Sequence, residues 1–578
     1  MEDHLIRMFL NRAEKYGTKQ VFRYRDKDNH YQAINWKQLK AMVDDVLSAL
    51  TVLQCSKSEP VGIFSSNRYE WFLTDLGILA AGAVVVPFYA TASREQVKYI
   101  LDETRMKIIF VGDKAQLELV LSLMEEGSTL EKIVVFNNIE SEDDRVIYFN
   151  DFLKLPAEKN ANITIEEVEE NYRADDLATI IYTSGTTGEP KGAMLTHDNF
   201  IFCFHIHDKR LNVNENDVSL CFLPLSHVFE RLWSQYLLHC GAVNVFLENP
   251  REVIDVLSVV KPTVMCTVPR FFDKTLKAIH TEAEKWPAFK QKIFNWSLEK
   301  GHEVIEYQCR AQDVPFGLKW KHKIADLLVL KKLRGIFGGN IKTMPCSGSA
   351  IDTQVLKFFH AMGIFVNYGY GATETTATVS CFKTDRYYYG TCGTVMPAVD
   401  VLISENGEIL VKGRSVFKGY FKKQKETDEA LKDGWFQTGD EGYLDHQNNL
   451  VMLDRIKDLM KTSVGKYVSP QKLELLLSHD ELVEHIIVVG DNRQYVTALV
   501  VPVMEKLKQV AGNTGISFTD EEDLIQAPGI YQLFENRFNQ LQQNLTPYER
   551  IVKFTLLTEP FSIEAGTMTN TLKLRRRS

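Results

Sequence analysis

The stretch from Tyr182 to Gly192, YTSGTTGEPKG, has the composition of a loop that binds phosphate. Its glycines permit backbone angles that point successive N–H groups inward. Its serine and threonine hydroxyls add donors, and Lys191 adds a positive charge. Apolar residues from Leu177 to Tyr182 and from Ala193 to Leu195 predict that this loop joins two strands. A Walker A loop would instead read GxxxxGK[ST] and open a helix, so this loop is of another kind.

The loop resembles the phosphate loop of the adenylate-forming superfamily, which contains acyl-CoA synthetases, peptide-synthetase adenylation domains and firefly luciferase. The resemblance implies that it holds the phosphates of ATP. Thr186 and Lys191 would then be catalytic. The residues implied to bind the nucleotide in this loop are Thr183, Ser184, Gly185, Thr187 and Gly188.

A second motif, YGATE at Tyr370 to Glu374, matches the YGxTE pattern of the same superfamily. An ATP site needs a planar ring to stack on adenine, a glycine for close approach, a hydroxyl for phosphate and a carboxylate for Mg²⁺. Tyr370, Gly371, Thr373 and Glu374 supply these groups in that order. The pentapeptide alone would be a weak signal, but it follows the first loop at the spacing of the superfamily.

A carboxylate and a guanidinium further along the chain are suited to hold a ribose. Asp440 lies in DGWFQTGDEGYLD, and Arg455 lies in NNLVMLDRIKDLMK. A carboxylate can accept hydrogen bonds from two vicinal hydroxyls, and an arginine can hold the same edge. An isolated turn aspartate would mean little, whereas Asp440 within WFQTGD resembles the superfamily's ribose ligand.

The last part of the chain resembles the mobile C-terminal domain of the superfamily. Lys457 occupies the position of the family hinge, and KYVSPQKLELLL starts a new small domain. Long-chain members usually have Gly-Glu in the loop that approaches CoA, whereas this chain has Gly465 and Lys466. The terminal GTMTNTLKLRRRS resembles the last family motif and places the catalytic lysine at Lys573.

The acyl side of the site is indicated by CFLPLSHVFERLW, which contains His227. A hydrogen-bonded histidine in a packed turn explains this residue as well as a functional role does. The resemblance implies that His227 walls the acyl pocket, and HVFER is the form common in long-chain acyl-CoA synthetases. Some bacterial relatives carry a tryptophan gate where this chain has Arg231. Gly348, Ser349 and Ala350 are implied to bind the acyl substrate as well.

The stretch from Val259 to Ile279 also resembles the long-chain branch, and a helical insertion follows from Thr281 to Leu333. Short adenylation domains have no counterpart of this insertion. It would suit a tunnel lining or a membrane-facing surface, and ordinary helix packing explains it equally well.

From Val61 the chain alternates short apolar runs with helical patterns, which predicts βαβ units and a largely parallel sheet covered by helices. The acidic stretch from Ser141 to Tyr172 is expected to be a solvated connection. Asn406-Gly407 predicts a hairpin turn in a small β subdomain. We expect an α/β fold: a large N-terminal domain at 1–455 with two helix-covered sheets and the β subdomain, then a small mobile α+β domain at 456–578.

Composition restricts the class of protein further. A net charge of −9 and a pI near 5.9 argue against a nucleic-acid partner. The nine cysteines contain no C-x-x-C pair, so neither a disulfide framework nor a zinc site is indicated, and a reducing compartment fits. The N-terminus does not resemble a secretory signal, and the longest apolar run, Leu76 to Val86, is too short to span a bilayer. We expect a cytoplasmic protein whose membrane contact, if any, is peripheral.

Together the motifs imply a long-chain fatty acid–CoA ligase that uses ATP, Mg²⁺ and CoA. The fatty acid would attack the α-phosphate of ATP to give acyl-AMP and pyrophosphate, and CoA would then displace AMP. Three alternatives remain: transfer to a carrier protein or activation of another hydrophobic acid, a lipid-binding relative without catalysis, and an ATPase of the kinase type. The sequence leaves chain length, homodimer formation and membrane association open.

Overall fold

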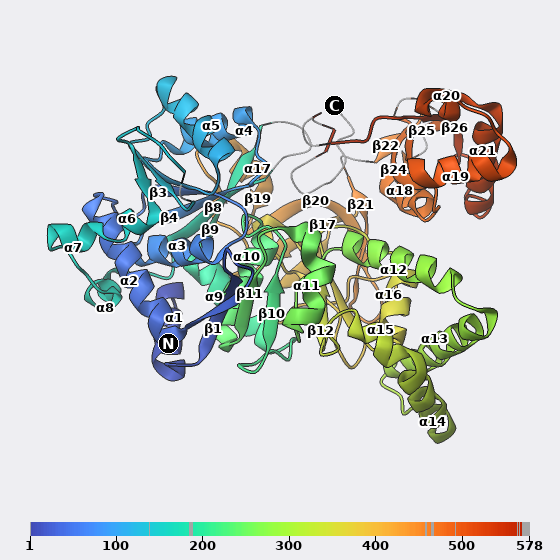
Figure 1. The fold of residues 1–578 in the computed structure, drawn as a ribbon, viewed down its shortest axis with the longest axis horizontal. Helices are drawn as coiled ribbons and strands as arrows, with labels where there is room; N and C mark the ends of the chain where they lie inside the picture. The colour runs from blue at the N-terminus through green and yellow to red at the C-terminus, as the bar shows by residue number, and fades with distance from the viewer. Residues whose placement is uncertain are drawn as a thin grey trace.

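The computed structural model describes residues 2–137, 139–183, 189–456, 459–463, 467–491, 493–562, 565 and 567–568. Figure 1 shows a large N-terminal body and a smaller C-terminal unit at its upper right. The body contains two sheet layers and a β subdomain, and the C-terminal unit has a hydrophobic core of its own. The fold class is therefore as predicted.

The first sheet of the body follows the predicted βαβ alternation. Its strand order is β18-β9-β8-β4-β3-β5-β6-β7, and the strands from β8 to β7 run parallel. Apolar strands that are buried on both faces are expected in a parallel sheet. The elements are α1 (Leu5–Tyr16), α2 (Trp36–Val52), β3 (Pro60–Phe64), α3 (Tyr69–Ala80), β4 (Val84–Phe88), α4 (Arg94–Thr104), β5 (Ile108–Val111), α5 (Lys114–Glu125), β6 (Lys132–Val135), β7 (Val146–Tyr148), β8 (Leu177–Thr183), β9 (Lys191–Thr196) and β18 (Gly419–Tyr420).

Several helices of the body start at capping boxes, in which the N-cap side chain and the third helical residue satisfy each other's backbone N–H groups. The N-cap residues are Asn35 for α2, Ser93 for α4, Asp113 for α5 and Thr196 for α9. These local signals set where the helices begin, and apolar faces decide where they pack.

The second layer combines segments that are distant in sequence. Strand order β10-β11-β1-β2 brings the N-terminal hairpin against β11, while β12-β13-β14-β15 forms its continuation. Isolated bridges from Val264 and Thr267 connect β10 to β12. The elements are β1 (Gln20–Arg25), β2 (Tyr31–Asn35), α9 (His197–Asp208), β10 (Val218–Cys221), α10 (Val228–Cys240), β11 (Val243–Phe246), α11 (Val253–Val260), α12 (Pro269–Glu284), β12 (Thr343–Cys346), α16 (Thr353–Ala361), β13 (Phe365–Tyr370), β14 (Ser380–Cys381) and β15 (Thr394–Val395).

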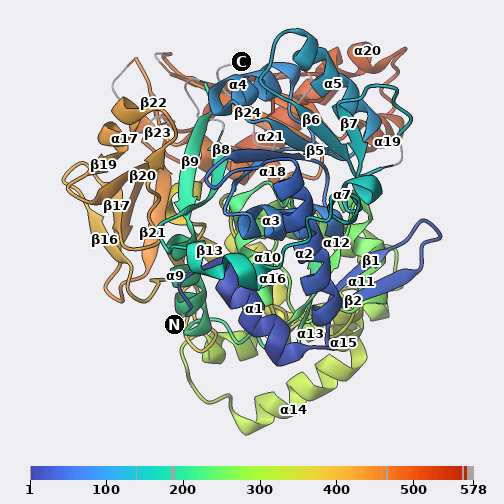
Figure 2. The same ribbon diagram turned by 90° about the vertical axis from the view of Figure 1, so that its left-hand side faces the viewer.

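The helical insertion forms a hairpin at one end of the body (Figures 1 and 2). Its helices pack against each other, and α13 also packs against α16. The last turns pass through a π-helical segment. The elements are α13 (Ala288–Gln308), α14 (Phe316–Ala325), the π segment Asp326–Leu330 and α15 (Lys331–Gly335).

The small β subdomain confirms the predicted hairpin, because β16 and β17 pair antiparallel around Gly407, whose φ is 84°. Strand β20 then pairs with β17, β19 and β21. The elements are β16 (Asp400–Ile403), β17 (Glu408–Lys412), α17 (Gln424–Ala430), β19 (Leu431–Lys432), β20 (Trp435–Leu444) and β21 (Leu450–Arg455).

The C-terminal unit packs helices against the sheet β24-β25-β26. It touches the body through polar contacts. Lys277 Nζ donates to the Ser478 carbonyl at 3.1 Å, and His479 Nε2 lies 2.9 Å from Asp352 Oδ2. The elements are β22 (Met460–Lys461), β23 (Tyr467–Val468), α18 (Pro470–Ser478), β24 (Val483–Val489), β25 (Val496–Pro502), α19 (Met504–Thr514), α20 (Glu521–Gln526), α21 (Pro528–Leu541) and β26 (Ile551–Leu556).

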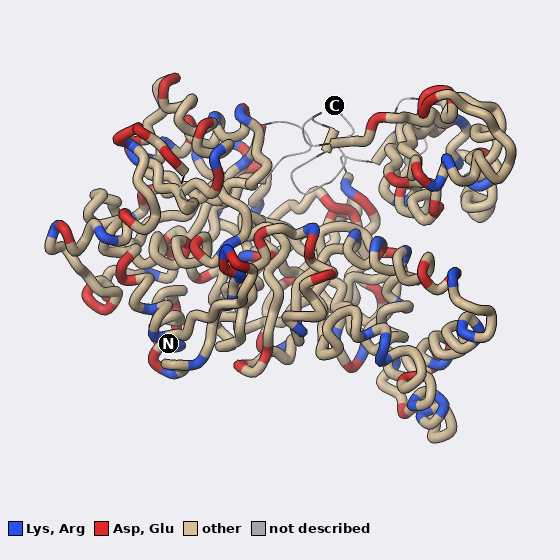
Figure 3. Tube along the Cα trace, in the orientation of Figure 1, with Lys and Arg blue, Asp and Glu red and all other residues tan. Residues whose placement is uncertain are grey.

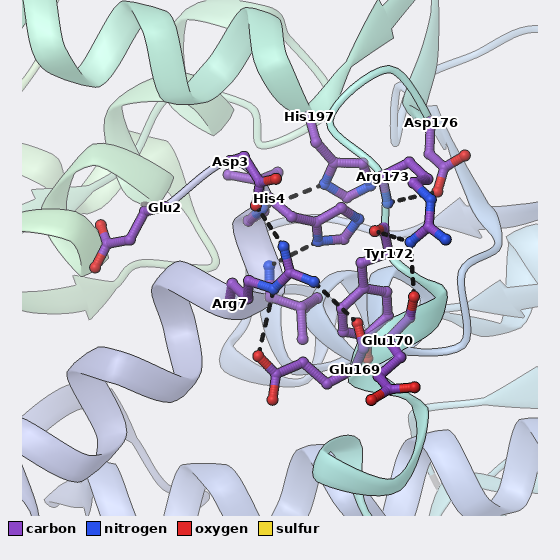
Figure 4. A network of polar contacts seen from close by, with 12 residues as sticks. Glu2, Asp3, His4, Arg7, Glu169, Glu170, Tyr172, Arg173, Asp176 and His197 are labelled. Carbon is purple, nitrogen blue, oxygen red and sulfur yellow. Dashed lines mark hydrogen bonds and ion pairs between the residues drawn. The ribbon is translucent and has the colours of Figure 1, made fainter.

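The acidic connection departs from the expectation of a solvated segment. It adds β7 to the sheet edge and forms short helical turns, α6 (Phe149–Phe152), α7 (Leu155–Lys159), α8 (Ile165–Val168) and a 3₁₀ turn Glu169–Asn171. Its end packs on the N-terminal helix (Figure 4), where the Tyr172 ring is buried and stacks on the His4 ring, with 4.4 Å between the ring centroids. Arg7 pairs with Glu169 at 3.3 Å. The charge run misled the prediction because Tyr172 packs on His4 and two of the carboxylates pair with cations of the neighbouring helices, Glu169 with Arg7 and Glu166 with Lys40.

Candidate active site

The predicted phosphate loop joins two antiparallel strands, β8 and β9, with Thr183 opposite Lys191. The placement between strands is thus confirmed. Residues Ser184, Gly185, Thr186, Thr187 and Gly188 lie outside the described residues. Strand β18 pairs with β9 close to these strand ends, at Ala193 and Met194.

Tyr420 brings the two predicted phosphate and metal residues together. Its hydroxyl donates to Glu374 Oε1 at 2.8 Å, and Lys191 Nζ lies 5.0 Å from the centroid of its ring. Burial raises the pKa of the Tyr420 hydroxyl, so it stays protonated and acts as the donor. The Tyr420 side chain thus contacts both a carboxylate, Glu374, and a cation, Lys191.

The predicted adenine and ribose residues also converge. The Tyr370 hydroxyl donates to Asp440 Oδ2 at 2.5 Å, and Arg455 Nε lies 3.3 Å from Asp440 Oδ1. Asp440 and Arg455 are cross-strand partners on β20 and β21, so sheet register sets their contact. Burial raises the pKa of the Tyr370 hydroxyl, and the neighbouring carboxylate raises it further. Asp440 is buried while Arg455 stays half exposed.

The backbone between these two groups is tightly packed. A Cβ atom added to Gly371 would lie 1.8 Å from the Ala377 carbonyl oxygen, so this position tolerates only glycine. Thr373 is buried and begins the 3₁₀ turn Thr373–Thr375, which carries Glu374. The turn therefore fixes the position of Glu374 relative to Tyr370.

An apolar cavity of about 40 Å³ adjoins Tyr370. The cavity lies between helices α9 and α10 and the strands β12 to β14. Its lining residues are His207, Leu211, Phe229, Leu232, Trp233, Pro345, Cys346, Ser347, Asn367, Gly369, Tyr370, Ala377, Thr378, Ser380 and Cys381.

Two polar side chains in this lining are incompletely bonded. Both amide atoms of Asn367 are buried without a hydrogen-bond partner among the described residues, and so is His207 Nδ1. The other ring nitrogen of His207 contacts Thr378 Oγ1 at 3.1 Å. Because an unbonded buried amide costs free energy, we expect water or a bound molecule to satisfy Asn367.

The predicted acyl residues do not line this cavity. Gly348, Ser349 and Ala350 are exposed and follow Ser347, and the Tyr368 hydroxyl holds the Ser349 carbonyl at 3.1 Å. His227 caps the N-terminus of α10, where its Nδ1 accepts from the Phe229 N–H at 3.2 Å. The described lining takes Phe229, Leu232 and Trp233 from α10 instead of His227.

Arg231 points away from the cavity. Its guanidinium is buried against α3, where Nη2 lies 2.5 Å from Asp75 Oδ1. Gln235 donates to the other Asp75 oxygen at 2.8 Å. A residue held in a buried ion pair between two helices cannot swing as a gate, so α10 has a polar face toward α3 and an apolar face toward the cavity.

Glu230, next to Arg231, is buried among weak donors. It accepts from the Leu223 N–H at 3.2 Å, and the Cys266 thiol lies 3.2 Å away. Burial raises the pKa of the Glu230 carboxyl to about 7. This carboxyl is therefore partly protonated at neutral pH, without a described cation in contact.

The remaining predicted residues lie outside the described part of the chain. They are the hinge residue Lys457, the CoA-loop residues Gly465 and Lys466, and the catalytic candidate Lys573.

Sequence reasoning missed Tyr420 and the cavity residues of α9 and α10. Tyr420 follows a glycine in VFKGYF, a weak signal, and only its strand pairing with β9 brings it to Glu374. Phe229 and Trp233 lie four residues apart and so share one helix face, which was readable. The sequence did not reveal that this face borders a cavity.

Comparisons with known proteins identify the family of the chain. Residues 9–421 match the AMP-binding enzyme family, and residues 457–556 match the AMP-binding enzyme C-terminal domain. Long-chain-fatty-acid–CoA ligase FadD15 of Mycobacterium bovis is 32% identical over 536 residues, which cover 91% of this chain and 87% of that protein. Long-chain-fatty-acid–CoA ligase 1 of Homo sapiens is 31% identical, with 96% of this chain and 81% of that protein covered.

Solved structures show the same fold at lower identity. The anthranilate CoA ligase AuaEII, in complex with anthranoyl-AMP, has a TM-score of 0.73 at 18% identity and covers 99% of this chain and 96% of its own. ATP-bound MatB from Rhodopseudomonas palustris has a TM-score of 0.70 at 20% identity, and the match covers 100% of this chain and 98% of MatB. With the family matches over most of its length, the chain belongs to the AMP-binding enzyme family, in the branch of the long-chain-fatty-acid–CoA ligases.

Proposed function

We propose that this protein activates a long-chain fatty acid with ATP and transfers the acyl group to CoA. The enzyme is an AMP-forming acid–thiol ligase. The carboxylate attacks the α-phosphate of ATP, which releases pyrophosphate and leaves acyl-AMP, and the CoA thiol then displaces AMP. The observation that carries the proposal is that Tyr370, which donates to Asp440, lines an apolar cavity, while Glu374, four residues further along the chain, accepts from Tyr420.

The nucleotide lies beside β13, β20 and the facing ends of β8 and β9. Tyr370 and Gly371 take the adenine, while Asp440 and Arg455 hold the ribose hydroxyls. The loop from Thr183 to Lys191 and the hydroxyl of Thr373 meet the phosphates. The register between Asp440 and Arg455 supports this placement, because it presents a carboxylate and a guanidinium at one edge.

Glu374 suits a Mg²⁺ ion, which prefers carboxylate and phosphate oxygens. Among the described residues its side-chain hydrogen bond, from Tyr420, goes to Oε1, so Oε2 can take the cation. When bound, Mg²⁺ neutralises charge on the transferring phosphate. Tyr420 orients the carboxylate, and Lys191 adds a fixed positive charge beside it.

The acyl chain enters the cavity from Gly348, Ser349 and Ala350, with its carboxylate toward the nucleotide and His227 beside the entrance. Phe229, Trp233 and the small residues of β13 and β14 surround the methylenes. Apolar walls favour such a chain because burial removes its surface from water.

The C-terminal unit supplies the rest of the chemistry. We place the domain boundary at 455/456 and the hinge at Lys457. Lys573 bridges the carboxylate and the α-phosphate in the first step, and the loop at Gly465 and Lys466 meets CoA in the second. The polar contacts of Lys277 and His479 with their partners support a movable interface, since exposed pairs contribute little free energy.

We also propose that the enzyme is cytoplasmic and contacts membranes peripherally, where its substrate partitions. In the described part of the chain, every helix is too short or too polar to cross a bilayer. A homodimer is a further proposal, which the mass of the protein in solution tests.

The test is product analysis with purified full-length protein, ATP, Mg²⁺ and a panel of saturated acids from eight to twenty carbons. We expect acid-dependent pyrophosphate release, AMP rather than ADP, and acyl-CoA by chromatography. Parallel reactions replace CoA by an acyl carrier protein or the panel by aromatic and branched acids. Pyrophosphate release that no fatty acid stimulates would refute the proposal. Synthetic acyl-AMP isolates the second step, in which Lys573→Ala should retain activity.

A further inference from the structure

The outer face of α14 and of the π segment after it exposes large apolar side chains to solvent. Phe316 is 77% exposed, Trp320 55% and Leu327 70%, and Ile324 and Leu328 are also exposed. Soluble proteins rarely expose a contiguous set of this kind unless it binds something.

These side chains form one stripe. Phe316, Trp320 and Ile324 are spaced by four residues, and Leu327 and Leu328 continue the spacing by three and four, so they share a helix face. The Phe316 and Trp320 rings touch edge to face at 6.4 Å. Ala325 and Leu330 are buried on the other side, where the helix packs on α13. The stripe is therefore not the face that holds the helix to the protein.

Basic residues border the stripe. Lys319, Lys321 and Lys323 lie on α14, Lys331 and Lys332 follow on α15, and all five are exposed. Between residues 316 and 334 the one acidic residue, Asp326, pairs with Arg334 at 2.7 Å. This segment is strongly positive although the whole chain carries a net charge of −9.

The position of α14 makes the stripe accessible. Figures 1 and 2 show α14 at the extremity of the body, distant from the first sheet, and Figure 3 shows basic positions along its hairpin. Lys323 Nζ lies 5.7 Å from the centroid of the Trp320 ring, so a charge and an amphipathic ring lie together at the edge of the stripe.

We propose that α14 and the π segment form a docking surface for an anionic lipid bilayer. The helix lies in the plane of the interface, with Phe316, Trp320 and Leu327 among the acyl chains and the lysines at the headgroup phosphates. An apolar stripe flanked by lysines with an interfacial tryptophan is the composition that such helices need. A protein partner would require no such positive border, whereas anionic headgroups complement it.

This surface specifies the membrane contact of the proposed function, but it does not depend on ligase activity. Binding would place the enzyme where long-chain acids partition. A soluble eight-carbon acid should be activated equally well with or without membrane, so the two proposals fail separately.

The test is co-sedimentation of the full-length protein with phosphatidylcholine vesicles that contain a quarter phosphatidylglycerol, and with phosphatidylcholine alone. We expect preferential binding to the anionic vesicles that weakens with salt. Phe316→Ser/Trp320→Ser/Leu327→Ser should lower binding at least tenfold. Lys319→Glu and Lys323→Glu should each lower it at least fivefold.

Matched controls are Leu402→Ser on β16 and Lys114→Glu on α5, which alter exposed residues elsewhere and should leave vesicle binding unchanged. Unchanged melting temperatures and unchanged activity on the eight-carbon acid show that each variant folds. With lipids brominated on their acyl chains, quenching of fluorescence should be weaker in Trp320→Phe than in the unaltered protein.

Three outcomes would overturn the proposal. The unaltered protein could fail to bind anionic vesicles, or the triple variant could bind as well as the unaltered protein. The triple variant could also convert a dimer to a monomer by light scattering with vesicle binding unchanged, which would assign the stripe to a second copy of the chain.

Discussion

The proposed nucleotide edge and the proposed acyl cavity share Tyr370 but are built in different ways. At the nucleotide edge, polar atoms contact each other at hydrogen-bond distance, as in Tyr370 with Asp440 and Tyr420 with Glu374. In the cavity, apolar residues from two helices and three strands leave space between them, and Asn367 is unbonded within the described residues. The first region is defined by contacts and the second by volume.

The difference shows where specificity can change. Few residue types can hold a ribose or a metal, so substitution at the nucleotide edge should remove activity for every acid. Many apolar residues can line a cavity, so substitution there should change which acid is preferred.

Behind the cavity, Arg231→Met should have the largest effect, on stability. It leaves the buried Asp75 carboxylate without its cation, which typically costs about 3–5 kcal/mol. Thermal and urea unfolding would measure the loss. The double variant Asp75→Leu/Arg231→Met should recover much of it, and equal losses in the single and double variants would contradict the pairing.

At the nucleotide edge, Glu374→Gln should lower acyl-AMP formation by about 10²–10³-fold, a cost of about 2.7–4 kcal/mol in transition-state stabilisation, because the metal loses a charged ligand. The amide oxygen can still accept from Tyr420, so the melting temperature should not change. Pyrophosphate release measures the rate. Glu405→Gln, on the exposed turn of the β16–β17 hairpin, is the control. Equal rates of pyrophosphate release in both variants would show that Glu374 does not hold the metal.

Asp440→Asn should raise the KM for ATP, since a charged acceptor contributes roughly 1.5–3 kcal/mol to such a hydrogen bond. That range corresponds to at least about tenfold. The rise should be the same for every acid in the panel. Asp400→Asn, exposed on β16, should have no effect, and a KM within twofold of the unaltered protein would show that Asp440 does not meet the ribose.

In the cavity, Leu211→Phe should shift preference toward shorter acids by about tenfold in kcat/KM, because the added ring atoms take space from the methylenes. The KM for ATP should stay unchanged, which separates this region from the nucleotide edge. Leu402→Phe, an exposed change on β16, controls for the substitution itself. A uniform loss for all chain lengths would contradict the assignment of the cavity.

The smallest effect should come from pH. Burial raises the pKa of Glu230 to about 7, so the folded state keeps a proton that the unfolded state releases. This contribution is full at low pH and is lost as pH rises through 7, so stability should fall by about 1 kcal/mol between pH 6 and pH 8. Glu230→Gln should lack this pH dependence in thermal unfolding. If stability fell with pH in parallel for the variant and the unaltered protein, the prediction would be contradicted.

The sequence by itself determined the polar part of this protein. YTSGTTGEPKG between two apolar runs indicated a loop between strands, and Asn406-Gly407 indicated the β16–β17 hairpin, which the strand pairings confirm. The roles of Tyr370, Asp440 and Glu374 stay predictions, although the structure brings their neighbourhoods together. Such signals are readable because turns and charged ligands restrict residue type at fixed local spacing.

Only the tertiary structure decided how distant segments meet. It paired the N-terminal hairpin with β11, buried Tyr172 against His4, and placed Tyr420 on Glu374. It also turned Arg231 toward Asp75 and left a cavity beside Trp233. Apolar surfaces are interchangeable in sequence because burial depends on area rather than on residue identity, so which surfaces meet is settled only when the whole chain packs.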